Sequence, residues 1–229
     1  MDKNKINSWQ VSLSVVLITI IISFALGALF KDYVIGPLTL VFGFLNAYYL
    51  ALGRWENYIY GILSTLTYTY ISAVNGLYGW LIFSLIFYIP SQIYGIVNWV
   101  KNKSKTEVKM RSFNLVNSIV ICLTIIIGSV VLGFLLSLIP DQNLAFLDST
   151  SQIINICGII LVVLRFRDCW YIWIVNNIID LIIWLINCIN GTKYSEMGLI
   201  VAIMFLVMNI IGLIVWIKTE KRQKSQAVN

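Results

Sequence analysis

Residues 114–138, NLVNSIVICLTIIIGSVVLGFLLSL, form an apolar run that contains no Asp, Glu, Lys or Arg. A helix of about 20 apolar residues crosses the hydrocarbon core of a bilayer, so this run predicts a transmembrane helix. The whole 229-residue chain is also strongly apolar, with 59% hydrophobic residues, 11% charged residues and a mean hydropathy of +0.87. Because soluble domains carry about 25% charged residues, we expect an all-α integral membrane protein without a separate soluble domain.

Further apolar runs flank this one, separated by charged residues or by Gly, Asn and Pro. The eight expected helices cover residues 11–30, 34–52, 57–74, 77–100, 114–138, 144–164, 169–188 and 195–217. The first of them is longer than the roughly 7–15 apolar residues of a signal peptide, so we expect a retained anchor. Residues 1–229 are thus interpreted as one membrane domain with a polar cytoplasmic tail at 218–229.

Basic residues collect on one side of the expected bundle. Of the 16 Lys and Arg residues, only Lys31 and Lys193 fall in loops on the other side. The positive-inside rule therefore places both termini in the cytoplasm, which requires an even number of spans. The net charge of +6 then reflects topology, and no basic, aromatic module indicates nucleic-acid binding.

The segments 34–100 and 144–217 resemble each other as two three-helix repeats. The aligned positions are Gly43 with Gly158, Trp55 with Trp170, Tyr58 with Trp173, Asn75-Gly76 with Asn190-Gly191 and, after a short gap, Gln92 with Asn209, Gly95 with Gly212 and Trp99 with Trp216. A single linker helix at 114–138 gives both repeats the same orientation. The sequence therefore predicts parallel repeats in a 3+1+3 order, with 11–30 as an extra helix and a substrate site between the repeats.

Polar side chains at membrane depth gather on the expected helix at 169–188. One stripe of this helix, at steps of three and four residues, consists of Trp170, Trp173, Asn177, Asp180 and Trp184. A carboxylate in the middle of a span costs about 2.5–3.5 kcal/mol on insertion scales. Asp180 is therefore expected to face a wet cavity or a hydrogen-bonding partner.

Amide side chains on other helices extend this candidate site. Gln92 follows an expected kink at Pro90, and its aligned partner is Asn209. Asn57 begins the expected helix at 57–74, which also carries several Ser, Thr and Tyr side chains. Amides donate and accept hydrogen bonds, and indoles offer flat faces. The set suits a flat, polar, mostly uncharged heterocycle or a delocalised cation.

Other classes of function have little support in the residues. The chain has no histidine, and Cys122, Cys157, Cys169 and Cys188 form no CxxC spacing, so no metal site, disulfide or cofactor is indicated. No Ser-Lys motif or pair of carboxylates on one helix suggests an enzyme, and no GxxxxGK[ST] loop supports ATP-driven transport. A non-transporting membrane subunit and proton coupling through Asp180 stay open.

From about residue 40 to 220 the chain resembles the bacterial PnuC-type vitamin transporters, best known for nicotinamide riboside. The matching motifs are NYIYG at 57–61, LYG at 77–79, YIPSQIYG at 88–95, Trp99, FLDS at 146–149, WYIW at 170–173, Asn177 and the closing Gly212 to Trp216. The resemblance implies a SWEET-like 3+1+3 core in a homotrimer in the bacterial inner membrane. It also implies facilitated diffusion of a vitamin, trapped afterwards by a cytoplasmic kinase.

The resemblance carries some site residues over to this chain. It places Trp173, Asn177 and Gln92 at the substrate, with Trp170 and Asn57 nearby. With the two further polar positions, the candidate substrate-binding residues are Trp173, Asn177, Gln92, Trp170, Asp180, Asn57 and Asn209.

Two positions depart from the pattern of the family. Leu147 stands where Trp is usual, and Asp180 stands where a small polar or apolar residue is expected. The extra carboxylate keeps thiamine and a (deoxy)nucleoside open as alternatives to nicotinamide riboside.

We expect reporter fusions to show both termini in the cytoplasm, because the basic residues determine the orientation of the spans. A reporter that is active only in the cytoplasm will be active when fused after Lys224, and a periplasmic reporter will be active after Lys193. The opposite pattern would overturn the topology and, with it, the parallel orientation of the repeats.

Overall fold

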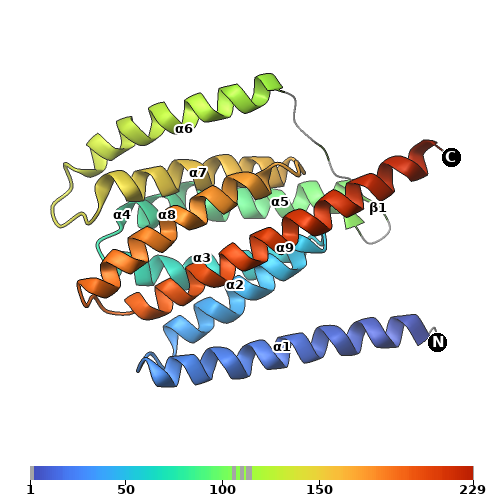
Figure 1. Cartoon of the computed structure of the whole chain (residues 1–229), viewed down its shortest axis with the longest axis horizontal. Helices are drawn as coiled ribbons and strands as arrows, with labels where there is room; N and C mark the ends of the chain where they lie inside the picture. The colour runs from blue at the N-terminus through green and yellow to red at the C-terminus, as the bar shows by residue number, and fades with distance from the viewer. Residues whose placement is uncertain (1–2, 105–106, 109–110, 112–114, 229) are drawn as a thin grey trace.

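The computed structural model describes residues 3–104, 107–108, 111 and 115–228, which form a bundle of helices (Figure 1). In chain order the helices are α1 (Lys3–Leu29), α2 (Ile35–Ala51), α3 (Asn57–Val74), α4 (Tyr78–Phe83), the π-helix η1 (Ser84–Tyr88), α5 (Ile89–Asn102), α6 (Leu115–Leu136), α7 (Ala145–Val163), α8 (Cys169–Ile189) and α9 (Ser195–Val228). The short strands β1 (Lys103–Ser104) and β2 (Glu107–Val108) pair antiparallel after α5.

Several of these helices are long and apolar enough to cross a membrane. Within the described residues there are five such segments: Tyr78–Asn102, Ser118–Leu136, Ala145–Val163, Cys169–Ile189 and Ser195–Gln223. The described apolar parts of α1 and α2 are shorter, Ser14–Leu29 and Ile35–Ala51. The protein is therefore a multi-pass helical membrane protein, as its composition predicted.

The start of α1 and the end of α9 lie at the same end of the bundle, while α1 and α6 lie at opposite sides of it (Figure 1). This arrangement agrees with an even number of spans. Lys105 and Lys109, which the sequence grouped with the basic side, lie outside the described residues.

Two clusters of buried hydrophobic side chains lie at opposite ends of the bundle. The Trp99 cluster, where α2, α5 and α7 end, consists of Leu50, Ala51, Tyr58, Trp99, Leu161, Val162, Val163, Phe166, Cys169, Trp170 and Trp216. The Trp184 cluster, where α3 and α8 end and α9 begins, consists of Leu40, Tyr68, Ile71, Leu77, Ile183, Trp184, Met197, Val201 and Ala202. The middle of the bundle, between these clusters, is where polar side chains are buried.

Reciprocal hydrogen bonds tie the two halves of the chain together. Trp99 on α5 donates from Nε1 to the carbonyl oxygen of Val162 on α7, 3.0 Å away. Trp216 on α9 donates in the same way to the carbonyl oxygen of Leu50 on α2, 3.1 Å away. The two indole rings also contact each other, with centroids 6.1 Å apart. Each half therefore satisfies a buried donor on the other half.

The turns after α2 and α7 have the same hydrogen bonds. The backbone N–H of Gly53 donates to Leu50, and that of Arg165 donates to Val162, each at 2.9 Å. Both turn residues have a positive φ, 65° for Gly53 and 68° for Arg165. These two turns are therefore equivalent, even though only one of them contains the glycine that this conformation favours.

This equivalence corrects part of the alignment between the two halves. Tyr58 on α3 corresponds to Trp170 on α8, and each ring lies where a Cβ of the facing Gly95 or Gly212 would be. The aligned pairs that are wrong are Gly43 with Gly158, Trp55 with Trp170 and Tyr58 with Trp173. They fail because α8 has 21 residues and α3 has 18, and an extra turn inside an apolar helix leaves no mark in composition.

The expected helix at 77–100 is continuous but irregular. Its π-helical turn, η1, precedes Pro90, which has no N–H to donate and whose ring crowds the preceding turn. The N–H of Ile89 accordingly bonds to the carbonyl oxygen of Ser84. The irregularity predicted at Pro90 thus takes the form of a π-bulge just before the proline.

The expected tail also differs from the structure. The helix predicted to end at 217 continues as α9 to Val228. Arg167, in the turn before α8, holds this extension by an ion pair to Glu220, with Nη1 and Oε2 2.7 Å apart. Glu220 is only 4% exposed, so the extension begins as part of the packed bundle.

We expect Gly212→Ala to destabilise the protein. The new Cβ would lie 2.3 Å from the ring of Trp170, which is completely buried against Trp216 and has no room to move. Overpacking of this kind costs about 1–3 kcal/mol, measurable as a lower melting temperature in detergent. The matched control is Gly128→Ala on α6, where the Cβ would lie 3.2 Å from the flexible side chain of Ile153. Equal melting temperatures of the two variants would contradict this packing.

Candidate functional site

A cavity of about 150 Å³ lies between the two hydrophobic clusters, with walls from α2, α3, α4, α5, α7, α8 and α9. Its polar wall consists of Asn46, Asn57, Ser64, Thr65, Gln92, Asn155, Asn176, Asn177, Asp180 and Asn209. Its aromatic wall consists of Tyr58, Tyr68, Trp80, Trp173 and Phe205. Both halves of the chain contribute to it, so the cavity lies at the interface between them.

Six of the seven candidate residues line this cavity, and Trp170 does not. Trp170 is 0% exposed and belongs to the Trp99 cluster, where its ring meets Trp216 with centroids 5.6 Å apart. It also packs edge-on against Trp173, at 5.8 Å, so it supports the cavity wall from behind.

The residues of the predicted stripe on α8 therefore lie in three different environments. Trp170 packs in one hydrophobic cluster, and Trp184 packs in the other, where its Nε1 donates to the Tyr68 hydroxyl at 2.5 Å. Only the middle of the stripe, with Trp173, Asn177 and Asp180, reaches the cavity. Periodicity identified the inward face of the helix but not the depth of each residue along it.

Asp180 is held by hydrogen bonds from neutral groups. Ser151 on α7 donates from Oγ to Oδ1, at 2.7 Å, and Asn176 on α8 donates from Nδ2 to Oδ2, at 2.8 Å. Asn155, one turn after Ser151, donates from Nδ2 to the Ser151 hydroxyl at 3.5 Å. Both carboxylate oxygens thus have donors, as expected for a buried acid.

Gln92 faces the cavity from α5, on the opposite half of the wall. Its Nε2 donates to Thr65 Oγ1 on α3, at 2.9 Å, which fixes the orientation of the amide. Gln92 is 8% exposed, and its Oε1 has no hydrogen-bond partner among the described residues. The acceptor end of this amide is therefore unpaired, and it packs against Gly61.

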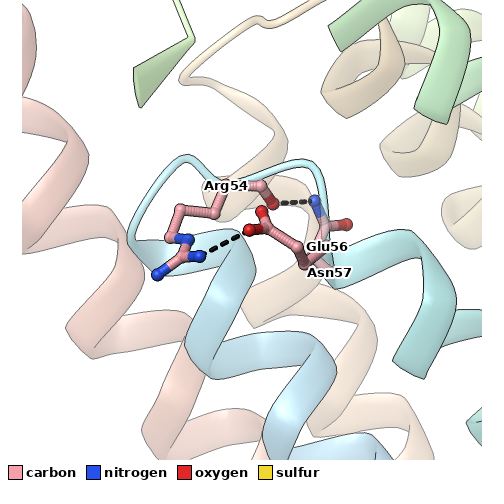
Figure 2. A network of polar contacts seen from close by, with 3 residues as sticks. All are labelled: Arg54, Glu56 and Asn57. Atoms are coloured by element: carbon pink, nitrogen blue, oxygen red, sulfur yellow. Dashed lines mark hydrogen bonds and ion pairs between the residues drawn. The ribbon is translucent and has the colours of Figure 1, made fainter. Parts of the chain in front are cut away.

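The turn between α2 and α3 positions Asn57 (Figure 2). The Asn57 side chain donates from Nδ2 to the carbonyl oxygen of Arg54, at 2.6 Å, and the Asn57 carbonyl accepts from Asn46 Nδ2, at 2.9 Å. Arg54 pairs with Glu56 at 2.5 Å, and this hydrogen bond raises the pKa of the arginine. Asn57 is thus occupied mainly in closing the turn from which α3 begins.

Some of the unpaired buried polar atoms among the described residues belong to side chains of the cavity wall. Besides Gln92 Oε1, they include Asn177 Nδ2 and Asn176 Oδ1, on side chains that are only 5% and 2% exposed. Leaving a buried polar group unpaired costs about 1–3 kcal/mol, so buried groups of this kind are normally satisfied. The wall thus offers both a donor and acceptors that a polar ligand would satisfy.

Three asparagines of the wall were not among the candidates from sequence. Asn46 on α2, Asn155 on α7 and Asn176 on α8 all line the cavity. Each is an amide within an apolar span, and such residues tend to face the inside of a bundle. This signal was present in the sequence, but Asn46 and Asn155 belong to helices that no aromatic stripe marks.

Comparisons with known proteins agree with this geometry. The model of the nicotinamide mononucleotide transporter family matches residues 33–218. The nicotinamide riboside transporter PnuC of Neisseria mucosa is 28% identical over 193 residues, which cover 81% of this chain and 73% of the relative. The transporter of the same name in Haemophilus influenzae is 24% identical over 184 residues, which cover 79% of this chain and 77% of the relative.

A solved structure is also similar. The crystal structure of the vitamin B3 transporter PnuC superposes with a TM-score of 0.77 and 26% identity, and the match covers 90% of each chain. The resemblance to PnuC-type transporters is thereby confirmed in sequence and in fold. Because the matched residues run from the start of α2 into α9 and include the whole cavity wall, the chain belongs to the nicotinamide mononucleotide transporter family.

Proposed function

We propose that the protein carries nicotinamide riboside across the bacterial inner membrane by facilitated diffusion. The names of its relatives in Neisseria mucosa and Haemophilus influenzae support this substrate. A cytoplasmic kinase would trap the riboside by phosphorylation, which would maintain the inward gradient. In this proposal the protein itself catalyses no reaction and needs no cofactor.

The observation that carries the proposal is the pairing of an aromatic face with unpaired amide atoms. Trp173 lines the cavity one turn from Asn177, whose Nδ2 is a buried, unpaired donor, and Gln92 Oε1 is a buried, unpaired acceptor in the same wall. The nicotinamide ring can stack on an indole, and its carboxamide both accepts and donates hydrogen bonds. We assign Trp173, Asn177, Gln92 and Asn209 to direct binding of the substrate.

The remaining candidates take supporting roles in this proposal. Trp170 holds the Trp173 ring, and Asn57 holds the turn at the start of α3. Asp180 supplies charge to the wall in this proposal.

We propose that the core is a 3+1+3 arrangement with eight spans in total. The spans α2, α3 and α4–α5 would form one repeat, α7, α8 and α9 the other, α6 the linker and α1 the extra helix. The equivalent turns at Gly53 and Arg165 and the reciprocal bonds of Trp99 and Trp216 support parallel repeats. A homotrimer with cytoplasmic termini completes the proposal.

The cavity favours a transporter over a non-transporting subunit. In a subunit whose polar stripes serve only to join helices, those stripes would pack directly against one another. Here the polar side chains of both halves face a common space and leave polar atoms unpaired. Thiamine and deoxynucleosides are the competing substrates, and they are included in the binding tests.

We expect Trp173→Ala and Asn177→Ala each to weaken nicotinamide riboside binding roughly tenfold or more. Loss of the indole removes stacking worth about 0.5–1.5 kcal/mol beyond its area, and loss of the amide leaves a buried ligand group unpaired at about 1–3 kcal/mol. Calorimetry of the purified protein, with thiamine and deoxynucleosides in parallel, gives the dissociation constants. Trp55→Ala and Asn190→Ala, outside the cavity wall, are the controls. Wild-type affinity in both site variants would place the substrate elsewhere.

In proteoliposomes without a membrane potential, we expect transport to stop at equal concentrations on the two sides. The cavity wall, as described, contains no ATP-binding loop, and Asp180 is the one acid that lines it, so the wall itself holds no series of acids to relay protons. An imposed pH gradient should therefore leave the final level unchanged, whereas a riboside kinase enclosed in the vesicles should raise it. Accumulation driven by the pH gradient alone would instead show proton coupling.

A further inference from the structure

We propose that Asp180 makes this transporter selective for the positively charged form of its substrate. Nicotinamide riboside carries a delocalised positive charge on its pyridinium ring, and its dihydro form has the same ribose and carboxamide without that charge. The inference rests on the proposed function and specifies which feature of the substrate this chain reads. It gives a role to one of the two residues at which the chain departs from the family pattern.

Asp180 is the one Asp, Glu, Lys or Arg among the described residues that line the cavity. The ion pairs within the described part of the chain join Arg54 to Glu56 and Arg167 to Asp168 and Glu220, all in turns or in the α9 extension. No basic side chain therefore compensates Asp180 inside the wall. In this inference Asp180 is ionised, and its carboxylate gives the cavity a net negative charge.

The hydrogen bonds of Asp180 stabilise its charge without cancelling it. Ser151 and Asn176 donate to the two carboxylate oxygens, at 2.7 and 2.8 Å. Neutral donors of this kind favour the ionised form of an acid, but the unit charge still acts across the cavity. In surroundings of low dielectric constant this charge attracts a nearby cation much more strongly than it would in water.

The neighbours of Asp180 also suit a flat cation. Asn176 turns its Nδ2 to the carboxylate and leaves its Oδ1 unpaired, which adds a second partial negative charge to the same wall. Trp173, Trp80 and Tyr68 line the same cavity, and aromatic faces attract cations. A carboxylate, a free carbonyl oxygen and several ring faces together favour a ring that carries delocalised positive charge over the same ring without it.

A second buried acid, Asp148, can be compared with Asp180. Asp148 on α7 is 1% exposed, and it accepts hydrogen bonds from the Gly79 N–H, Gln142 Nε2 and Gln152 Nε2, at 3.0, 3.0 and 2.8 Å. It does not line the cavity, and its bonds join α7 to the start of α4. Asp148 therefore shares the burial and the neutral donors of Asp180 but lacks its access to a ligand.

The test compares the affinities of purified wild-type, Asp180→Asn and Asp148→Asn proteins for nicotinamide riboside and for dihydronicotinamide riboside. The measured quantity is the ratio of the two dissociation constants, because a general loss of packing weakens both ligands together and leaves the ratio unchanged. We expect Asp180→Asn to reduce the preference for the cation about tenfold or more, since it removes one unit of charge and keeps the side-chain size. Asp148→Asn, the same chemical change outside the wall, should alter the ratio less than about threefold.

The outcomes separate the inference from the proposed function. A lower preference for the cation in Asp180→Asn alone supports the inference. Equal weakening of both ligands, an unchanged ratio, or the same change of ratio in Asp148→Asn overturns it and leaves the proposed function standing. A folded wild-type protein that binds neither form contradicts the proposed function and the inference together.

Discussion

Backbone carbonyl groups at the ends of helices need partners, and in a bilayer water cannot supply them within the hydrocarbon core. At the ends of α2 and α7, each such carbonyl accepts both the N–H of the following turn and the indole N–H of a tryptophan from the other half of the chain. These shared acceptors set the spacing of α2, α5, α7 and α9 at one end of the bundle. The position of every wall residue on those helices depends on them.

The cavity exists because the ends of the bundle pack more tightly than its middle. Tyr58 and Trp170 fill the space left by Gly95 and Gly212, whereas amides and small hydroxyl side chains occupy the next turns of α3 and α8. Aromatic rings from the two clusters then close the space above and below. Helices that carry large apolar side chains at their ends and polar side chains in their middle thus account for both the packing of the bundle and the site.

Much of this could be predicted from sequence because lipid imposes strict rules on a helix. Long apolar runs predicted the long helices, and the distribution of Lys and Arg predicted that the two termini share one end of the bundle. The position of Trp170 could not be predicted, because Trp170 and Trp173 differ by less than one turn and only tertiary packing decides which ring is covered. The shift in the alignment between α3 and α8 could not be predicted for a similar reason. One more apolar turn in α8 changes the alignment register without changing the hydrophobic pattern.

The π-helical turn η1 makes the two halves mechanically unequal. The span from Tyr78 to Asn102 is interrupted at Ser84–Tyr88, whereas its counterpart α9 runs without interruption through 34 residues. A helix bends most easily where its regular hydrogen bonding is already broken. In any rearrangement that opens the cavity, α9 would move as a rigid helix, whereas the α4–α5 span would bend at η1. Motion would then begin on the side of the bundle that carries Gln92.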